Sequence, residues 1–344
     1  MASSRTGISL RPDHARHADA GHPERPARLD AVARAIELDA ELGGLARVAG
    51  EAARRADLER VHLPAYLDVL ETFCARGGGA LDVDTYATAA SYRIAREACG
   101  DLLAVVDAVL DGALANGFAL GRPPGHHARP AQAMGFCLLS NVAVAARHAQ
   151  ARGAERVLVV DIDVHHGNGT QEAFYDDPSV LVVGSQQADL FPGSGRLLET
   201  GVGAGQGATV NLPVPAGTDD AAMRALYRAV VEPVADRFRP DLVLVSAGYD
   251  AHRLDPLGGL ALSVAGLADL VGVALEIADR HAGGRLVCSL EGGYHPEALG
   301  ACVAATLRRL QDPAASVRDP FGPTRVPGPD LSALTEALRA VHGL

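Results

Sequence analysis

Residues able to bind a metal ion and to move a proton are concentrated in one ten-residue stretch, residues 161–170, which reads DIDVHHGNGT. The apolar run 157–160 precedes it and predicts a buried strand of a parallel sheet. Because alternate side chains of a strand point to the same side, we expect Asp161, Asp163 and His165 to share a face. Asp163 and His165 could then hold one divalent ion, with a third ligand from elsewhere in the chain.

Three other predicted strands are also followed by chemically active side chains. His126 and His127 follow a strand at 118–120, Asp250 follows one at 242–246, and Tyr294 follows one at 286–289. In an open parallel sheet, sites form beyond the carboxyl ends of the strands. Each of these residues alone is as compatible with capping or packing as with catalysis. Four strands that deliver polar groups to one edge favour an active site.

Asp163, His165 and Asp250 together offer two carboxylates and one imidazole. Three protein ligands leave coordination positions open for water and substrate, which is typical of a catalytic metal site. The oxygen-rich ligand set favours Zn²⁺ and also suits Fe²⁺. The predicted chemistry is metal-assisted hydrolysis of an amide without a covalent enzyme intermediate.

The remaining groups supply proton transfer and charge stabilisation. His126 and His127 follow a rigid Pro-Pro-Gly approach and are candidate general bases near neutral pH. Asp161 and Asn168 are candidate partners for these rings; a carboxylate would raise the basicity of a histidine, whereas an amide could only orient it. Tyr294 could donate a hydrogen bond to a developing oxyanion.

The elements that position these residues alternate between strands and helices, which predicts one doubly wound α/β domain with a parallel sheet. We expect a single domain over 1–344, with a catalytic core at about 7–310 and a Pro-rich segment plus C-terminal helix at 311–344. His14 and His17 are expected in an exposed loop and 77–79 in a turn. Strands are predicted at 7–10, 118–120, 157–160, 180–183, 209–214, 242–246 and 286–289, and helices at about 23–42, 63–75, 91–114, 134–152, 219–238, 264–281 and 331–341.

The composition narrows the class of protein. A net charge of −11 argues against nucleic-acid binding. The sequence has neither an apolar signal segment nor an apolar run of membrane-spanning length, and its five cysteines form no CxxC pair, so we expect a reduced, cytoplasmic enzyme. All 31 basic residues are arginine and the chain is rich in alanine, which suggests a GC-rich bacterial genome.

Taken together, the motifs resemble the histone deacetylase family of the arginase/deacetylase superfamily. The resemblance runs from about residue 7 to 310, with the motifs in family order, and implies a fold with a central, mostly parallel eight-stranded sheet. Asn168, where other branches carry an aspartate, resembles the class II branch and implies a class II-like bacterial deacetylase. The motifs are HPERPARL at 22–29, RPPGHHA at 122–128, DIDVHHGNGT at 161–170, GYD at 248–250 and EGGY at 291–294.

The resemblance also assigns roles. It implies zinc at the three ligands named above, and it pairs His126 with Asp161 and His127 with Asn168. His127 is then the general base and later the general acid, whereas His126 acts mainly through its charge. Tyr294 would bind and polarise the scissile carbonyl.

Further residues are implied to shape the path of the substrate. Gly135, Phe136 and Phe191 would line a narrow channel for an acyl-lysine-like chain, and Arg28 would belong to an internal exit channel for acetate. Leu257 stands where polyamine-selective relatives carry a glutamate, and an apolar residue offers no anionic partner for a second amine. We therefore expect acetylated lysine side chains as substrates. The alternatives are an acetylpolyamine or other small-acetamide amidohydrolase and, third, a non-catalytic protein that binds acylated ligands.

A structural potassium ion behind the zinc is implied as well. It would be held by Asp161 and by the main-chain carbonyls of Asp163 and His165. The family's Ser-x-His stretch is replaced here by Gly-Ser-Gln-Gln at 184–187, which leaves Ser185 as a further candidate ligand.

Overall fold

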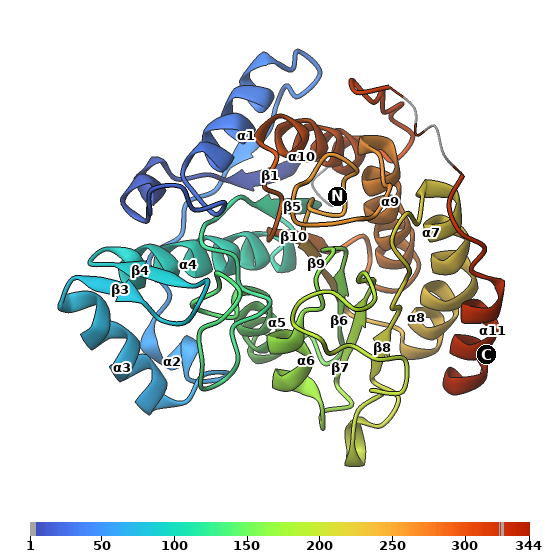
Figure 1. Ribbon diagram of the computed structural model, residues 1–344, viewed down its shortest axis with the longest axis horizontal. Helices are drawn as coiled ribbons and strands as arrows, with labels where there is room; N and C mark the ends of the chain where they lie inside the picture. The colour runs from blue at the N-terminus through green and yellow to red at the C-terminus, as the bar shows by residue number, and fades with distance from the viewer. Residues whose placement is uncertain (1–4, 323, 325–326) are drawn as a thin grey trace.

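The computed structural model describes residues 5–322, 324 and 327–344, and its centre is an eight-stranded sheet in which every pairing is parallel (Figure 1). The order across the sheet is β2-β1-β5-β10-β9-β6-β7-β8, which confirms the predicted α/β class and the parallel eight-stranded sheet. The strands are β1 (Thr6–Ser9), β2 (Ala46–Arg47), β5 (Asn116–Ala119), β6 (Val157–Asp161), β7 (Val180–Gly184), β8 (Thr209–Asn211), β9 (Leu242–Ala247) and β10 (Leu286–Leu290).

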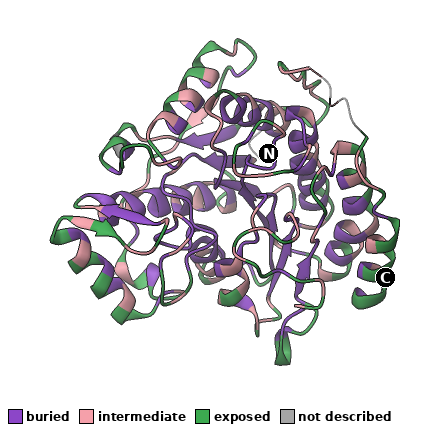
Figure 2. Cartoon of the chain, in the orientation of Figure 1, coloured by how far each residue is buried: buried purple, intermediate pink, exposed green. Residues whose placement is uncertain are grey.

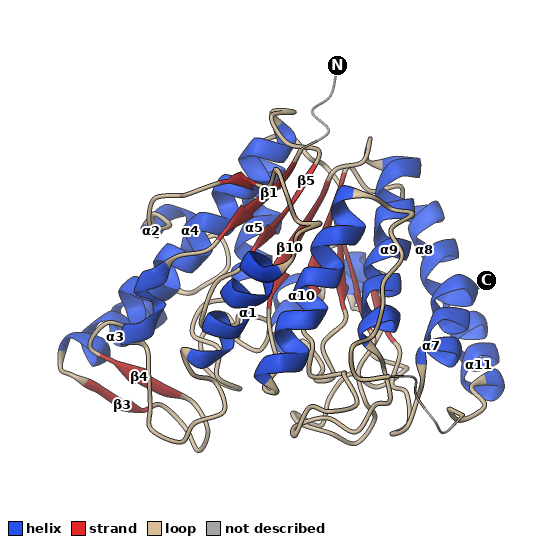
Figure 3. Ribbon diagram, turned by 90° about the horizontal axis from the view of Figure 1, so that it is seen from above, coloured by secondary structure: helices blue, strands red, loops and turns tan. Residues whose placement is uncertain are grey.

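Helices cover both faces of the sheet, so its strands are buried, except for the edge strand β2 (Figures 2 and 3). One face is covered by α2 (Arg55–Leu58), α3 (Pro64–Ala75), α4 (Ser91–Leu110) and α5 (Asn141–Ala151). The other is covered by α1 (Ala27–Leu38), α7 (Asp220–Leu226), α8 (Glu232–Phe238), α9 (Val264–His281), α10 (Pro296–Gln311) and α11 (Ser332–His342). Along β6 the side chains alternate between the two cores: Val157 and Val159 pack in the first, Leu158 and Val160 in the second.

Two local predictions are wrong. The expected turn at 77–79 is the start of β3 (Gly78–Ala80), which pairs antiparallel with β4 (Tyr86–Thr88). The expected helix at 134–152 begins only at Asn141, because the chain turns sharply before it: Gly135 and Phe136 have φ of 54° and 67°, and Met134 bridges Cys137. That turn places Gly135 against the His127 ring.

Other differences concern helix boundaries and omissions. The helix expected at 219–238 is divided by a π-helical turn at Tyr227–Val231, and those expected to reach 42 and 114 end at Leu38 and Leu110. Helices α6 (Asn168–Phe174) and α10 were not predicted, although α10 ends at Gln311, where the catalytic core was expected to end.

His14 and His17 are buried, contrary to the predicted exposed loop. Their segment forms a 3₁₀ turn, Pro12–Arg16, whose carbonyls at His14 and His17 both accept hydrogen bonds from the buried Arg122 side chain. Local sequence could not show this, because the arginine lies more than a hundred residues further along the chain. Across the described part of the chain, no helix combines the length and apolar character needed to cross a lipid bilayer.

Candidate active site

The four strands whose ends carry the chemistry are immediate neighbours at the centre of the sheet, in the order β5-β10-β9-β6. All run parallel, so the loops that follow them emerge at one edge. The sheet order thus brings together side chains that are up to 168 positions apart in sequence, from His126 to Tyr294. In the structure, the side chains that follow these four strands lie at one edge of the sheet, as predicted.

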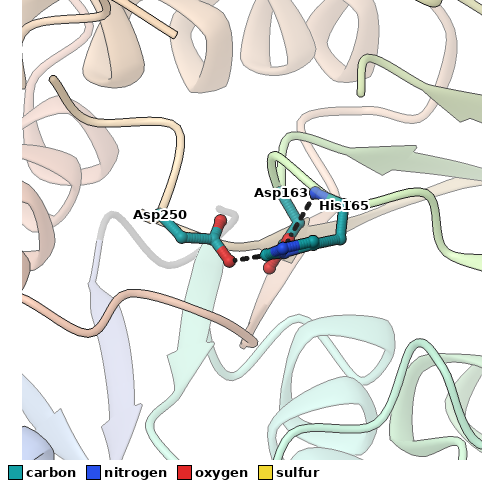
Figure 4. Close-up of side chains that lie close together, drawn as sticks. All are labelled: Asp163, His165 and Asp250. Carbon is teal, nitrogen blue, oxygen red and sulfur yellow. Dashed lines mark hydrogen bonds and ion pairs between the residues drawn. The ribbon is translucent and has the colours of Figure 1, made fainter. Parts of the chain in front are cut away.

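The three predicted metal ligands lie close together: one ligand atom from each of Asp163, His165 and Asp250 lies within 4.8 Å of the other two (Figure 4). The Nδ1 atom of His165 is 3.2 Å from Asp163 Oδ1 and 3.0 Å from Asp250 Oδ2, so this nitrogen faces both carboxylates. The first two residues follow β6 and the third follows β9, and these strands pair directly. The cluster has the composition and spacing of a three-ligand metal site.

The surroundings of these carboxylates fit a bound cation. Asp163 and Asp250 are fully buried side by side, and burial together with the neighbouring Asp163 charge raises the pKa of Asp250 to about 7. Main-chain N–H groups hold both carboxylates: Gly292 and His165 each donate to one oxygen of Asp163 at 2.9 Å, and Val164 donates to one oxygen of Asp250 at 3.0 Å. A divalent ion would offset the repulsion between the two buried negative charges.

Gly292 is required by this arrangement. A Cβ atom at this position would lie 2.2 Å from Asp250 Oδ2 and 2.6 Å from Asp163 Oδ2, which is closer than any side chain can approach. The Gly-Gly pair before Tyr294 therefore lets the main chain pass directly beneath the carboxylates.

The two histidines each have the partner that the family resemblance implied. His126 Nδ1 is 2.9 Å from Asp161 Oδ2, and His127 Nδ1 is 2.8 Å from Asn168 Oδ1. The imidazole rings lie 4.0 Å apart between centroids. With Nδ1 of each ring engaged, Nε2 is the nitrogen left to exchange a proton with water or substrate.

The surroundings shift the pKa values of the two imidazole rings in opposite directions. Burial by itself would lower the pKa of His126, but the carboxylates of Asp163 and Asp161 outweigh it and raise the pKa well above its usual value. Burial, reinforced by the charge of His126, lowers the pKa of His127 well below its usual value. The surroundings thus favour the charged form of His126 and the neutral form of His127.

Tyr294 lies in the turn that follows β10 and is held from two sides. Its main-chain N–H donates to Asp255, and the guanidinium of Arg28 lies 4.8 Å from the centre of its ring. Arg28 also donates to the carbonyls of Gly293 and Glu291, so it clamps the turn that carries the tyrosine. Burial raises the pKa of Tyr294 well above its usual value, which keeps the phenol protonated as a donor.

The predicted channel residues border the same site. The Phe136 ring lies 5.5 Å from the Tyr294 ring, and the Phe191 ring lies 5.1 Å from the His127 ring, all between centroids. Gly135 packs directly against His127, where a Cβ would lie 2.4 Å from the imidazole. Leu257 is half-buried, and its main-chain N–H donates to the same aspartate that holds Tyr294.

Ser185, the candidate potassium ligand, contacts Asp161, another of the predicted potassium ligands. Its hydroxyl is 3.2 Å from the Asp161 carbonyl and 2.7 Å from the Tyr227 hydroxyl. His166, for which only a structural role was expected, is buried, and its two ring nitrogens form hydrogen bonds with the side chains of Ser194 and Gln171. The potassium site stays a prediction.

Sequence reasoning missed a buried charge cluster behind the site. The fully buried Glu24 accepts hydrogen bonds from Arg122 at 2.5 and 2.6 Å and from Arg28 at 3.1 Å. Glu24 thus joins the arginine before the two histidines to the arginine behind Tyr294. The motif that contains Glu24, HPERPARL at 22–29, was recognised, but the local sequence gives no signal that this charged residue is buried.

Replacing Glu24 with glutamine is expected to destabilise the protein by about 3–5 kcal/mol, because two buried guanidinium groups lose their counter-charge. Burial alone would raise the pKa of Glu24, but Arg122 outweighs it and lowers that pKa well below 4.5. A lowered pKa stabilises the folded state fully above pH 4.5, and the stabilisation declines as the pH falls from there. Denaturant unfolding of both proteins across pH measures the difference.

Glu276→Gln is the matched control. Glu276 is 47% exposed and pairs with the exposed Arg228, so its loss should cost only about 0–1 kcal/mol. Equal destabilisation by the two substitutions would contradict the assignment of Glu24 as a buried counter-charge.

The doubly wound parallel sheet and the central carboxylate–histidine cluster define a protein of the arginase/deacetylase class. The family model described as the histone deacetylase domain matches residues 22–310. A solved structure described as the HDA15 HD domain superposes with a TM-score of 0.86, at 37% identity and 92% coverage of both chains. This chain belongs to the histone deacetylase family.

Two curated relatives are similar over most of their length. Histone deacetylase 14, chloroplastic, of Arabidopsis thaliana is 40% identical over 325 residues, covering 88% of this chain and 76% of that protein. A histone deacetylase-like amidohydrolase of Pseudomonas aeruginosa is 40% identical over 307 residues, covering 88% and 80%. Since the relatives are both plant and bacterial, the bacterial origin and cytoplasmic location of this chain stay predictions.

Proposed function

We propose that this protein is a zinc-dependent amidohydrolase that removes acetyl groups from lysine-like side chains. The observation that carries the proposal is the meeting, at one edge of the sheet, of three side chains able to hold a metal ion, a buried histidine oriented by an amide, and a tyrosine whose pKa is raised. The names of the relatives, deacetylases and a deacetylase-like amidohydrolase, support the same chemistry.

Zinc, when bound by Asp163, His165 and Asp250, supplies the Lewis acidity that activates water and polarises a carbonyl. Nε2 of His127 accepts a proton from the attacking water and later delivers one to the departing amine. His126, whose Nδ1 faces the carboxylate of Asp161, acts mainly through its charge and stabilises negative charge as it develops. The phenol of Tyr294 donates to the carbonyl oxygen as it becomes an oxyanion.

The preference for acetyl-lysine over acetylpolyamines rests on Leu257. An apolar side chain at this position gives no anionic contact for the distal ammonium of a polyamine. Leu257 and Tyr294 are linked through Asp255, whose carboxylate accepts a hydrogen bond from the main-chain N–H of each residue.

The test is acetate release by the purified protein from an acetyl-lysine peptide and from N-acetylputrescine, each with and without a chelator. We expect release mainly from the peptide, loss with the chelator and recovery on adding Zn²⁺. Preferential release from N-acetylputrescine would favour the polyamine alternative. No release from either substrate by the zinc-loaded protein would overturn both enzyme proposals and leave the binding protein.

A further inference from the structure

The side-chain amide of Asn168 has different hydrogen-bond partners at its two ends. Its Oδ1 lies 2.8 Å from Nδ1 of His127, and its Nδ2 donates to the sulfur of Met134 at 3.4 Å. Met134 belongs to the sharply turned loop 134–140 that also brings Gly135 against the His127 ring. The thioether is therefore linked to the proton-accepting histidine through a single side chain.

The direction of this amide decides which nitrogen of a neutral His127 carries the proton. When Oδ1 faces the ring, Nδ1 must be the N–H donor, and Nε2 keeps the lone pair that a general base needs. When Nδ2 faces the ring, it donates to Nδ1, and the proton moves to Nε2. A carboxylate presents an acceptor oxygen to the ring in either orientation. An amide presents an acceptor in one orientation and a donor in the other.

We propose that Met134 is a positioning residue that holds Asn168 in the productive direction. A thioether accepts hydrogen bonds weakly and donates none, so it favours the amide NH₂ at its end and rejects the amide oxygen. The oxygen is then left for His127. The inference rests on the proposed function, because the orientation of Asn168 affects turnover only if Nε2 of His127 receives a proton.

The position of the pair explains why a dedicated acceptor is needed. Met134 and Asn168 both line a surface groove together with Tyr175 and Pro192. Water in that groove both donates and accepts, so it satisfies either end of the amide equally. Without the sulfur, both directions of Asn168 become populated.

A double-mutant cycle with Met134→Leu and Asn168→Asp tests the proposal. In the natural background, Met134→Leu should lower kcat about 3- to 10-fold, the scale of one lost hydrogen bond, with little change in KM. In the Asn168→Asp background, the same substitution should change kcat by less than about 2-fold, because a carboxylate has no wrong direction. Met223→Leu, in the buried core, is the matched control and should leave kcat unchanged.

Equal losses in both backgrounds, or no loss in either, would overturn the proposal and leave Met134 a packing residue. Nitrogen-15 NMR of labelled histidine gives a readout that is independent of turnover. His127 should be protonated at Nδ1 in the parent protein, and Met134→Leu should shift part of the population to Nε2. An unchanged tautomer population would also overturn the proposal, whereas a protein that shows the shift but releases no acetate would contradict the proposed function alone.

Discussion

Asp250→Asn is expected to lower zinc affinity by more than about 10²-fold and to abolish acetate release with it. Loss of a partner that merely orients a metal ligand already costs about 10- to 100-fold in affinity, and this change would remove the proposed anionic ligand itself. Asparagine keeps the shape of aspartate and one carbonyl oxygen, so it can still accept the N–H of Val164 that now binds Asp250 Oδ1. Metal content after dialysis and acetate release measure the two effects.

Asp236→Asn is the control for Asp250. Asp236 is 49% exposed and pairs with Arg280 at the surface, so its loss should leave both zinc content and turnover unchanged. Full zinc content in Asp250→Asn would show that the cluster is not the metal site.

Tyr294→Phe is expected to reduce kcat by about 10²-fold or more while zinc content stays that of the parent. The phenol is the group proposed to donate to the oxyanion, and removing one such donor typically costs this much. The ring itself should stay in place, because its contacts with Phe136 and Arg28 involve the aromatic face and edge rather than the hydroxyl. Steady-state kinetics with the acetyl-lysine peptide, together with metal analysis, separates the two quantities.

Tyr92→Phe is the matched control, since Tyr92 packs in the core on one face of the sheet, with the Arg96 guanidinium 5.7 Å from its ring centre. It should affect stability more than turnover. Turnover of Tyr294→Phe equal to that of the parent enzyme would show that another group stabilises the oxyanion.

Seven of the eight strands of the central sheet, all except β2, and one long helix could be predicted because their signals are local. Residues 157–160 form an uninterrupted apolar run and become β6 almost without change of boundary. The helix expected at 264–281 is α9 residue for residue, since Ser263 caps its first turn and its apolar face repeats regularly. Elements whose form depends on distant contacts were predicted less well. The loop 134–140 has helical composition but is bent by its packing against His127.

The amino-acid sequence alone indicates which metal-binding and proton-transferring side chains the protein has, and which strand ends they follow. The Asp-x-Asp-x-His pattern, the histidine pair and the isolated tyrosine each follow an apolar run, and strand ends of a parallel sheet share an edge. Only the tertiary structure decided which groups meet. The central order β5-β10-β9-β6, the burial of Glu24 between two arginines and the contact of Met134 with Asn168 all join residues that are distant in sequence. Such contacts follow from how whole elements pack, and no local pattern of residues encodes them.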